Sequence, residues 1–138
     1  QSAATASFQV PDEPERLLLG PDGDGSGLRR LLTETGLHDE DAETYVAALN
    51  GPGALTAALN WFRAMDRAVL LDLKPIGVPT LYVWSTEDAA FGRTAAEDTR
   101  ECVEASYTFE VLEGVSHWIP ETAPERLSTL LVRHLAST

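Results

Sequence analysis

The chain has 138 residues, of which 43% are hydrophobic and 23% are charged, a composition typical of globular proteins and too apolar for a disordered one. This length suits one domain or part of a larger one. The formal net charge of −12 argues against nucleic acids as partners, because a field of that sign repels phosphate groups. No apolar run approaches the roughly 20 residues that cross a bilayer, which argues against a membrane partner as well.

Residues that bind metals or form disulfides are sparse. Cys102 is the single cysteine, so no internal disulfide can form, and no Cys/His cluster has the spacing of a zinc site. The segment 22–25 (DGDG) lacks the later ligands of a calcium loop and is predicted to be a solvated turn. We therefore expect no metal and no cofactor. One thiol leaves the compartment unknown, with the cytoplasm favoured over secretion. Any targeting signal would lie upstream of Gln1.

Residues 1–70 are predicted to be mainly helical. Prolines and the glycine-rich segment 20–27 indicate a loop at the start. Apolar residues then recur with helical spacing in three segments, namely Leu28, Leu31 and Leu32, then Ala42, Tyr45, Val46 and Leu49, then Leu55, Ala58, Leu59 and Phe62. Short helices with narrow apolar faces are not stable alone, so we expect these helices to pack on other elements.

Residues 76–138 alternate between strand and helix patterns. Residues 78–84 form a nearly continuous apolar run, which is typical of a strand in a parallel sheet, and residues 107–112 alternate as a second strand. A helix between two parallel strands is the repeating unit of an α/β fold. Because two strands alone do not make a stable sheet, we expect another part of the molecule to complete it.

Two capping boxes predict where the helices of this half begin. Thr94 with Glu97 predicts a helix that runs to about residue 103, and Thr122 with Glu125 predicts the last helix. The last helix has a full apolar stripe, made by Leu127, Leu130, Leu131, His134 and Leu135.

Two side chains with acid–base chemistry follow the two predicted strands. Asp88 lies after the first and His117 after the second. Catalytic groups gather at the carboxyl ends of parallel strands, so we expect these two side chains to meet although they are far apart in sequence. A carboxylate that accepts the Nδ1–H of an imidazole orients the ring and stabilises the imidazolium. The pair therefore predicts the orienting acid and general base of a nucleophilic hydrolase. The alternative acids are Glu87, Glu113 and Glu121.

The order of these motifs resembles the C-terminal half of an α/β-hydrolase. The resemblance rests on residues 79–88 (PTLYVWSTED), residues 114–120 (GVSHWIP) and Pro124-Glu125. Residues 53–64 (GALTAALNWFRA) resemble the epoxide-hydrolase-like branch, which carries Asn-Trp-Tyr-Arg where the helical cap rejoins the main domain. Together these motifs cover most of residues 52–138, and residues 1–50 fit the later part of a helical cap less specifically.

The resemblance implies an α/β fold class, with the last two parallel strands of an α/β-hydrolase, their flanking helices and a segment of the helical cap. Residues 1–52 would belong to the cap, residues 53–70 to a helix from cap to core, and residues 71–138 to the C-terminal part of the core. The N-terminal part of the hydrolase would complete the sheet.

The resemblance also assigns Asp88 to the triad acid and His117 to the triad base. The family's nucleophile, a Ser or an Asp, precedes the cap, and neither Gly-x-Ser-x-Gly nor Gly-x-Asp-x-Gly occurs in this sequence. We therefore expect the chain to be the second part of a hydrolase cut within its cap. It would be active only with its partner, the N-terminal half that carries the nucleophile.

Three aromatic residues, Trp61, Phe62 and Trp118, are predicted to bind a small hydrophobic substrate, by their place in the family pattern. Phe62 stands where epoxide hydrolases of this branch have a Tyr that hydrogen-bonds the epoxide oxygen. Ester hydrolysis, which uses an oxyanion hole instead, is therefore favoured, with epoxide and carbon–halogen hydrolysis as alternatives. A non-catalytic ligand-binding protein with the same fold is the rival interpretation.

Overall fold

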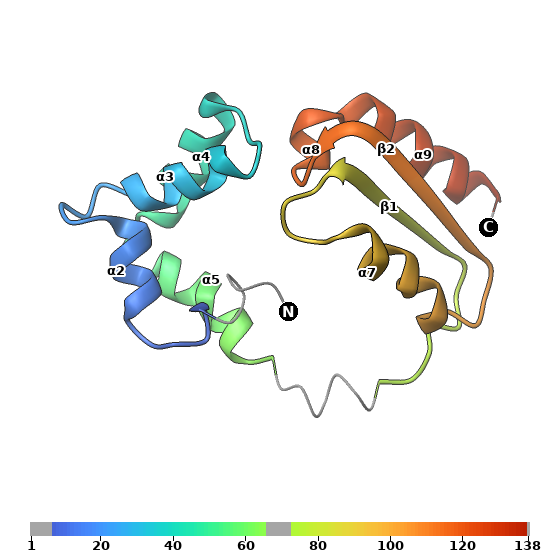
Figure 1. The fold of residues 1–138 in the computed structure, drawn as a ribbon, viewed down its shortest axis with the longest axis horizontal. Helices are drawn as coiled ribbons and strands as arrows, with labels where there is room; N and C mark the ends of the chain where they lie inside the picture. The colour runs from blue at the N-terminus through green and yellow to red at the C-terminus, as the bar shows by residue number, and fades with distance from the viewer. Residues whose placement is uncertain (1–6, 66–72, 138) are drawn as a thin grey trace. The chain divides into compact units, whose positions relative to one another are not determined.

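The computed structural model describes residues 7–65 and 73–137. The chain divides into two units, one made of Gln1–Glu34 and His38–Leu73, the other of Thr35–Leu37 and Lys74–Thr138. Figure 1 shows the helices of the first unit in blue to green and the elements of the second in yellow to red. Among the described residues no helix is both long and apolar enough to cross a membrane.

The first unit is helical, with α2 (Glu13–Leu19), α3 (Ser26–Glu34), α4 (Asp39–Leu49) and α5 (Ala54–Arg63). The last three confirm the predicted helical segments, but α5 ends at Arg63, short of the predicted extent. Residues 66–70 of the predicted helix lie outside the described residues. Each buries two apolar side chains, which are Leu28 and Leu32, Ala42 and Val46, and Leu55 and Leu59. The loop predicted before them is wrong at α2, because Pro14 lies in its first turn, where the missing N–H of proline costs no hydrogen bond.

A bidentate ion pair ties α5 to α2. The guanidinium of Arg63 donates from Nη1 and Nη2 to the two carboxylate oxygens of Glu15, each at 2.8 Å, and from Nη2 to the carbonyl of Val10 at 3.0 Å. The hydrogen bonds from Arg63 lower the pKa of Glu15 from its usual 4.5 to about 2. Arg63, the last residue of the Asn-Trp-Phe-Arg segment, therefore has a structural partner within the first unit.

This ion pair predicts how the stability of the first unit depends on pH. Because the pKa of Glu15 is lower in the folded state, its stabilisation is complete above about pH 4.5 and is lost as the pH falls from 4.5 to about 2. In thermal unfolding, Glu15→Gln is expected to lower the Tm at neutral pH and to flatten the fall in Tm across that window. Glu13→Gln, which changes an exposed carboxylate of the same helix, is the control. If acid lowered the Tm of Glu15→Gln as steeply as that of the wild type, protonation of Glu15 would not be the cause of the fall, and the prediction would be contradicted.

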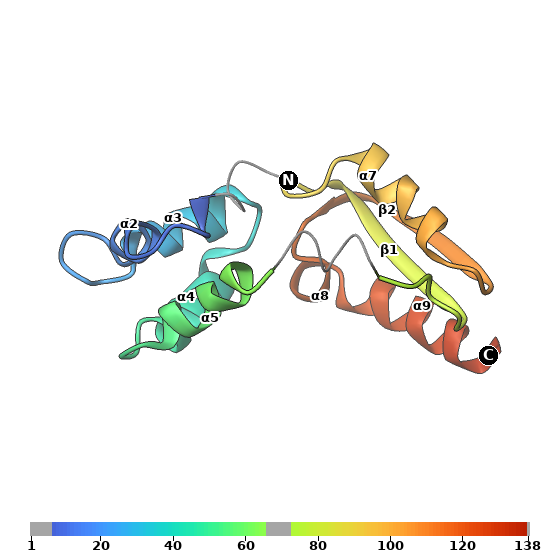
Figure 2. The same cartoon turned by 90° about the horizontal axis from the view of Figure 1, so that it is seen from below.

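The second unit is built on two parallel strands, β1 (Thr80–Glu87) and β2 (Tyr107–Ser116). The helix α7 (Arg93–Asp98) and the short 3-10 helix η1 (Thr99–Cys102) connect them, and α8 (Ile119–Thr122) and α9 (Pro124–Ser137) follow β2. Figure 2 shows α7 on one side of the sheet and α9 on the other. The predicted strand–helix–strand–helix order of an α/β fold is therefore confirmed.

Both strands extend further towards their carboxyl ends than predicted. They continue to Glu87 and Ser116, so Asp88 and His117 are each the first residue after a strand. The pairing is regular from Thr80 with Tyr107 as far as Ser85 with Leu112, and it shifts before Glu87 with Ser116.

The core of the second unit lies between the sheet and the helices that follow it. Its buried residues are Leu112, Val115, Ile119 and Ala123, with Val83, Leu127 and Leu130 packed against them. Only part of the apolar stripe predicted for α9 therefore packs against this core. Leu127 and Leu130 pack on the core, whereas Leu135 is 73% exposed within this chain.

Neither predicted capping box forms. The helix α7 begins at Arg93 after Gly92, and Glu97 pairs with Arg93 at 2.8 Å instead of capping Thr94. The hydroxyl of Thr122 donates to the carbonyl of Trp118 at 2.7 Å, because Thr122 ends the short helix α8. In each case a hydrogen-bond partner four residues earlier uses the group that the pattern assigned to capping.

Candidate active site

Asp88 is fixed by the backbone that follows it. Its side chain is only 7% exposed, and its Oδ1 accepts the N–H groups of Ala90 at 2.7 Å and Phe91 at 2.8 Å. A short polar side chain at the end of a strand often makes such a turn. Here the turn uses one carboxylate oxygen and directs the other, Oδ2, towards β2.

His117 meets this second oxygen. Its Nδ1 lies 3.0 Å from Oδ2 of Asp88, so the contact predicted from the two strand ends is present. With the proton on Nδ1 donated to the carboxylate, Nε2 is the nitrogen that accepts a proton. The side chain of His117 is 33% exposed, so the ring is accessible from solvent in this chain. Of the four acids considered from the sequence, Asp88 is the one hydrogen-bonded to His117.

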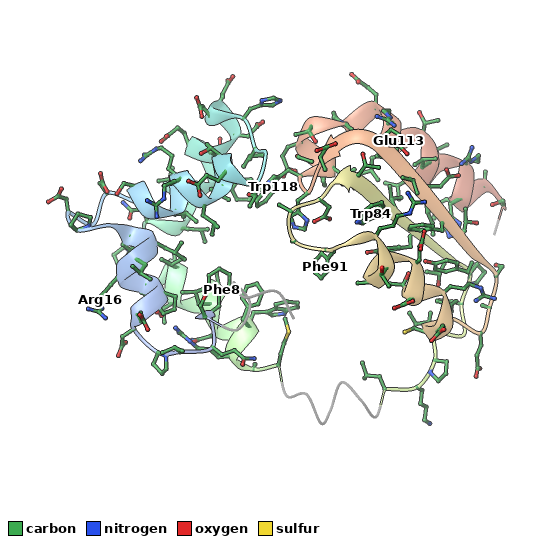
Figure 3. All side chains as sticks on the ribbon, viewed as in Figure 1. Phe8, Arg16, Trp84, Phe91, Glu113 and Trp118 are labelled. Carbon is green, nitrogen blue, oxygen red and sulfur yellow. The ribbon has the colours of Figure 1, made fainter. Side chains whose placement is uncertain are left out.

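The loop that carries Asp88 is anchored by an aromatic side chain of β1. The indole of Trp84 is buried and donates from Nε1 to the carbonyl of Phe91 at 2.9 Å. The ring of Phe91 lies 6.0 Å from the imidazole of His117, centroid to centroid. Figure 3 labels both aromatic residues on the second unit. Sequence reasoning missed Phe91, although its position three residues after Asp88 is a usable signal.

Burial and the charge of Asp88 also affect Tyr82, which lies near the start of β1. Its burial, and next the negative charge of Asp88, raise the pKa of the Tyr82 phenol above its usual value of 10.0. The ring stacks on Phe109 of β2 with centroids 5.8 Å apart. The side chain of Asp88 is itself only 7% exposed, so solvent screens its charge only weakly.

Trp118 holds a segment that is distant in sequence. Its indole Nε1 donates to the hydroxyl of Thr35 at 3.0 Å, and its ring lies edge-on to His117 at 5.6 Å. Next to Thr35, Gly36 has a φ of +94° and approaches Ser116 so closely that a Cβ would lie 2.6 Å from the Cβ of Ser116. Only glycine fits such a contact, so residues 35–37 lie tightly against the histidine loop. No local pattern pointed to this contact.

Trp61 and Phe62 belong to the first unit. Trp61 is 68% exposed, and the half-buried ring of Phe62 contacts the rings of Trp61 and Phe8 edge-on, at 5.5 Å and 5.3 Å. The structure therefore pairs these two rings with each other. Their role in substrate binding, like that of Trp118, stays a prediction.

No group of three or more His, Cys, Asp or Glu side chains suited to a metal ion occurs among residues 7–65 and 73–137. The chemistry available at the site is that of Asp88 and His117. A fixed carboxylate and a partly exposed imidazole can remove a proton from a nucleophile or from water, and can return it to a leaving group.

The chain is similar to proteins that are named as hydrolases. No family model matches the chain. The AB hydrolase superfamily protein YfhM of Bacillus subtilis is 35% identical over 98% of the chain, and epoxide hydrolase 3 of Mus musculus is 31% identical over 87% of it. The chain spans 48% and 34% of the length of these two proteins.

Solved structures show the same fold. A laboratory-evolved variant of potato epoxide hydrolase matches 98% of the chain with a TM-score of 0.77 at 20% identity. Epoxide hydrolase A of Mycobacterium thermoresistibile matches 96% with a TM-score of 0.75 at 22% identity, and the chain covers about half of each structure, 53% and 51%. The chain is therefore similar to a C-terminal portion of α/β-hydrolases of the epoxide-hydrolase-like branch, and it shares their fold.

Proposed function

We propose that this chain supplies the acid and the base of an α/β-hydrolase triad, with His117 as general base and Asp88 as the acid that orients it. The observation that carries the proposal is the 3.0 Å contact between Nδ1 of His117 and an Asp88 carboxylate whose other oxygen is held by two backbone N–H groups. This arrangement fixes the imidazole so that Nε2 takes the proton from the attacking group.

The nucleophile, a Ser or an Asp, would come from the N-terminal half of the same hydrolase, which is the partner we propose. Two observations support this. The chain spans about half the length of YfhM, and among the described residues the sheet has only two strands, fewer than an independently stable sheet needs. The unpaired edges of β1 and β2 offer backbone groups for further strands.

The substrate we propose is small and hydrophobic, and the reaction is ester hydrolysis. Phe62 supports this choice, because it carries no hydroxyl to donate to an epoxide oxygen. Epoxide opening is the second candidate, and the name of the relative epoxide hydrolase 3 favours it. Carbon–halogen hydrolysis is a further alternative that no observation favours. None of these reactions requires a metal or an organic cofactor.

The nature of the nucleophile can be tested by mass spectrometry of the intact protein. With an Asp nucleophile, His117→Gln is expected to accumulate an alkyl-enzyme from styrene oxide, because no base activates the water that would release it. With a Ser nucleophile, wild type releases p-nitrophenol from p-nitrophenyl butyrate through an acyl-enzyme, and His117→Gln forms no adduct. A wild-type protein that binds both probes without turning either over would favour the non-catalytic ligand-binding alternative.

The choice between ester and epoxide can be tested at Phe62. Phe62→Tyr supplies the missing hydroxyl, so we expect turnover of p-nitrophenyl butyrate to stay largely unchanged and opening of styrene oxide to rise about 10²-fold, the effect of a general acid. The two turnover numbers are measured on the same preparation. Phe109→Tyr, which adds a hydroxyl on β2, is the matched control and should change neither. A collapse of ester turnover in Phe62→Tyr would count against the esterase assignment.

A further inference from the structure

The pairing of β1 with β2 contains a bulge immediately before the two acid–base residues. Between Ser85 and Glu87 lies one residue of β1, whereas three residues of β2 lie between their partners Leu112 and Ser116. Without these two additional residues, the regular register would place Asp88 beside Val115. The bulge advances β2 so that His117 comes level with Asp88.

Two neighbouring hydroxyls of β1 hold this bulge. The side chain of Ser85 is fully buried, at 0% exposure, and its Oγ donates to the carbonyl of Ser116 at 2.7 Å. The hydroxyl of Thr86 accepts the N–H of Gly114 at 2.9 Å, at a backbone φ of +69° that suits glycine. A bulge removes ladder hydrogen bonds from the backbone, and these side chains supply replacements.

We propose that Ser85 and Thr86 are positioning residues, which set the place of His117 relative to Asp88 through the bulge. The bond from Ser85 ends on the carbonyl of the residue directly before His117, so it restrains the backbone that carries the imidazole. The bond from Thr86 fixes the glycine at which the bulge turns. The inference rests on the proposed function, because it gives these hydroxyls a role in the acid–base pair.

A small displacement of the bulge has a large chemical effect. The 3.0 Å contact between His117 and Asp88 has the usual length of an N–H···O hydrogen bond, and a shift of about 1 Å would carry it well outside that range. Misplacements of that size lower catalytic rates by about 10²-fold. The expected signature of a lost hydroxyl is therefore a fall in kcat that exceeds any change in KM, because the displaced group is the imidazole that takes the proton.

The kinetic test uses the intact protein and p-nitrophenyl butyrate or styrene oxide, whichever is turned over. Thr86→Val and Ser85→Ala are expected to lower kcat about 10- to 10²-fold, by more than any change in KM. Thr86→Ser, which keeps the hydroxyl, should restore most of the rate, and Thr108→Val, at an exposed position of β2, is the control. If Ser85→Ala does not fold, the Thr86→Val and Thr86→Ser pair decides. Equal rates in that pair would overturn the proposal.

A second readout separates this inference from the proposed function. Nitrogen NMR of the labelled His117 imidazole reports which ring nitrogen carries the proton, without any need for activity. Asp88→Asn is the reference for a lost carboxylate, and we expect Thr86→Val and Ser85→Ala to shift the proton from Nδ1 in the same direction. A change in Asp88→Asn alone would overturn the role of the hydroxyls and leave the acid–base pair standing. No change in Asp88→Asn would contradict the pair itself.

Discussion

His117→Ala in the intact protein is expected to lower turnover at least about 10³-fold, the largest effect of any single change in this chain. The imidazole is the group that accepts a proton at Nε2 while the Asp88 carboxylate holds Nδ1, and alanine removes both contacts. Stability should change little, because the His117 side chain is partly exposed and lies outside the buried core. The measurement is kcat at saturating substrate, together with thermal unfolding.

The matched control is His38→Ala. His38 precedes α4, is exposed and makes no side-chain capping hydrogen bond, so its loss should leave turnover unchanged. Near-normal turnover in His117→Ala would remove His117 from the mechanism.

Asp88→Asn is expected to lower turnover roughly 10³-fold. The asparagine amide oxygen can still accept the N–H groups of Ala90 and Phe91, so the loop keeps its shape. The variant loses the negative charge that stabilises the imidazolium, and the amide NH₂ facing His117 favours the wrong tautomer. The effect should appear in kcat, because neither change concerns substrate binding.

Glu87→Gln is the control for Asp88→Asn, since it neutralises the exposed neighbouring carboxylate at the end of β1. Its turnover should stay near the wild-type value. If Glu87→Gln and Asp88→Asn caused equal losses, the acid of the pair would be wrongly identified.

The acid–base contact could be predicted from the sequence because it depends on two general properties. Apolar β-forming runs identify parallel strands, and parallel strands bring their carboxyl ends to one edge. Asp88 and His117 follow such runs, so their meeting required no knowledge of the exact register. The helices α3, α4 and α5 were predictable for a similar reason, because a spacing of three and four residues marks one helical face.

The features that refine the site depend on exact register and on distant contacts. The bulge at Gly114 shifts the pairing by two residues, and hydrophobic alternation does not report such a shift in a strand this short. The hydrogen bond from Trp118 to Thr35 joins residues that are 83 positions apart, so no local pattern could indicate it. The capping boxes predicted at Thr94 and Thr122 were wrong, because Glu97 bonds to Arg93 and the hydroxyl of Thr122 bonds to the carbonyl of Trp118. The fold decides where each helix begins, and therefore which partner such a group takes.

The central claim is that Asp88 acts through His117 and not independently, and the double variant Asp88→Asn/His117→Ala tests it most directly. Residues that act as one unit are strongly non-additive, so the double variant should be no slower than His117→Ala by more than about threefold. A double variant slower than His117→Ala by the full roughly 10³-fold loss expected of Asp88→Asn would mean that the two side chains contribute separately, and would contradict the account.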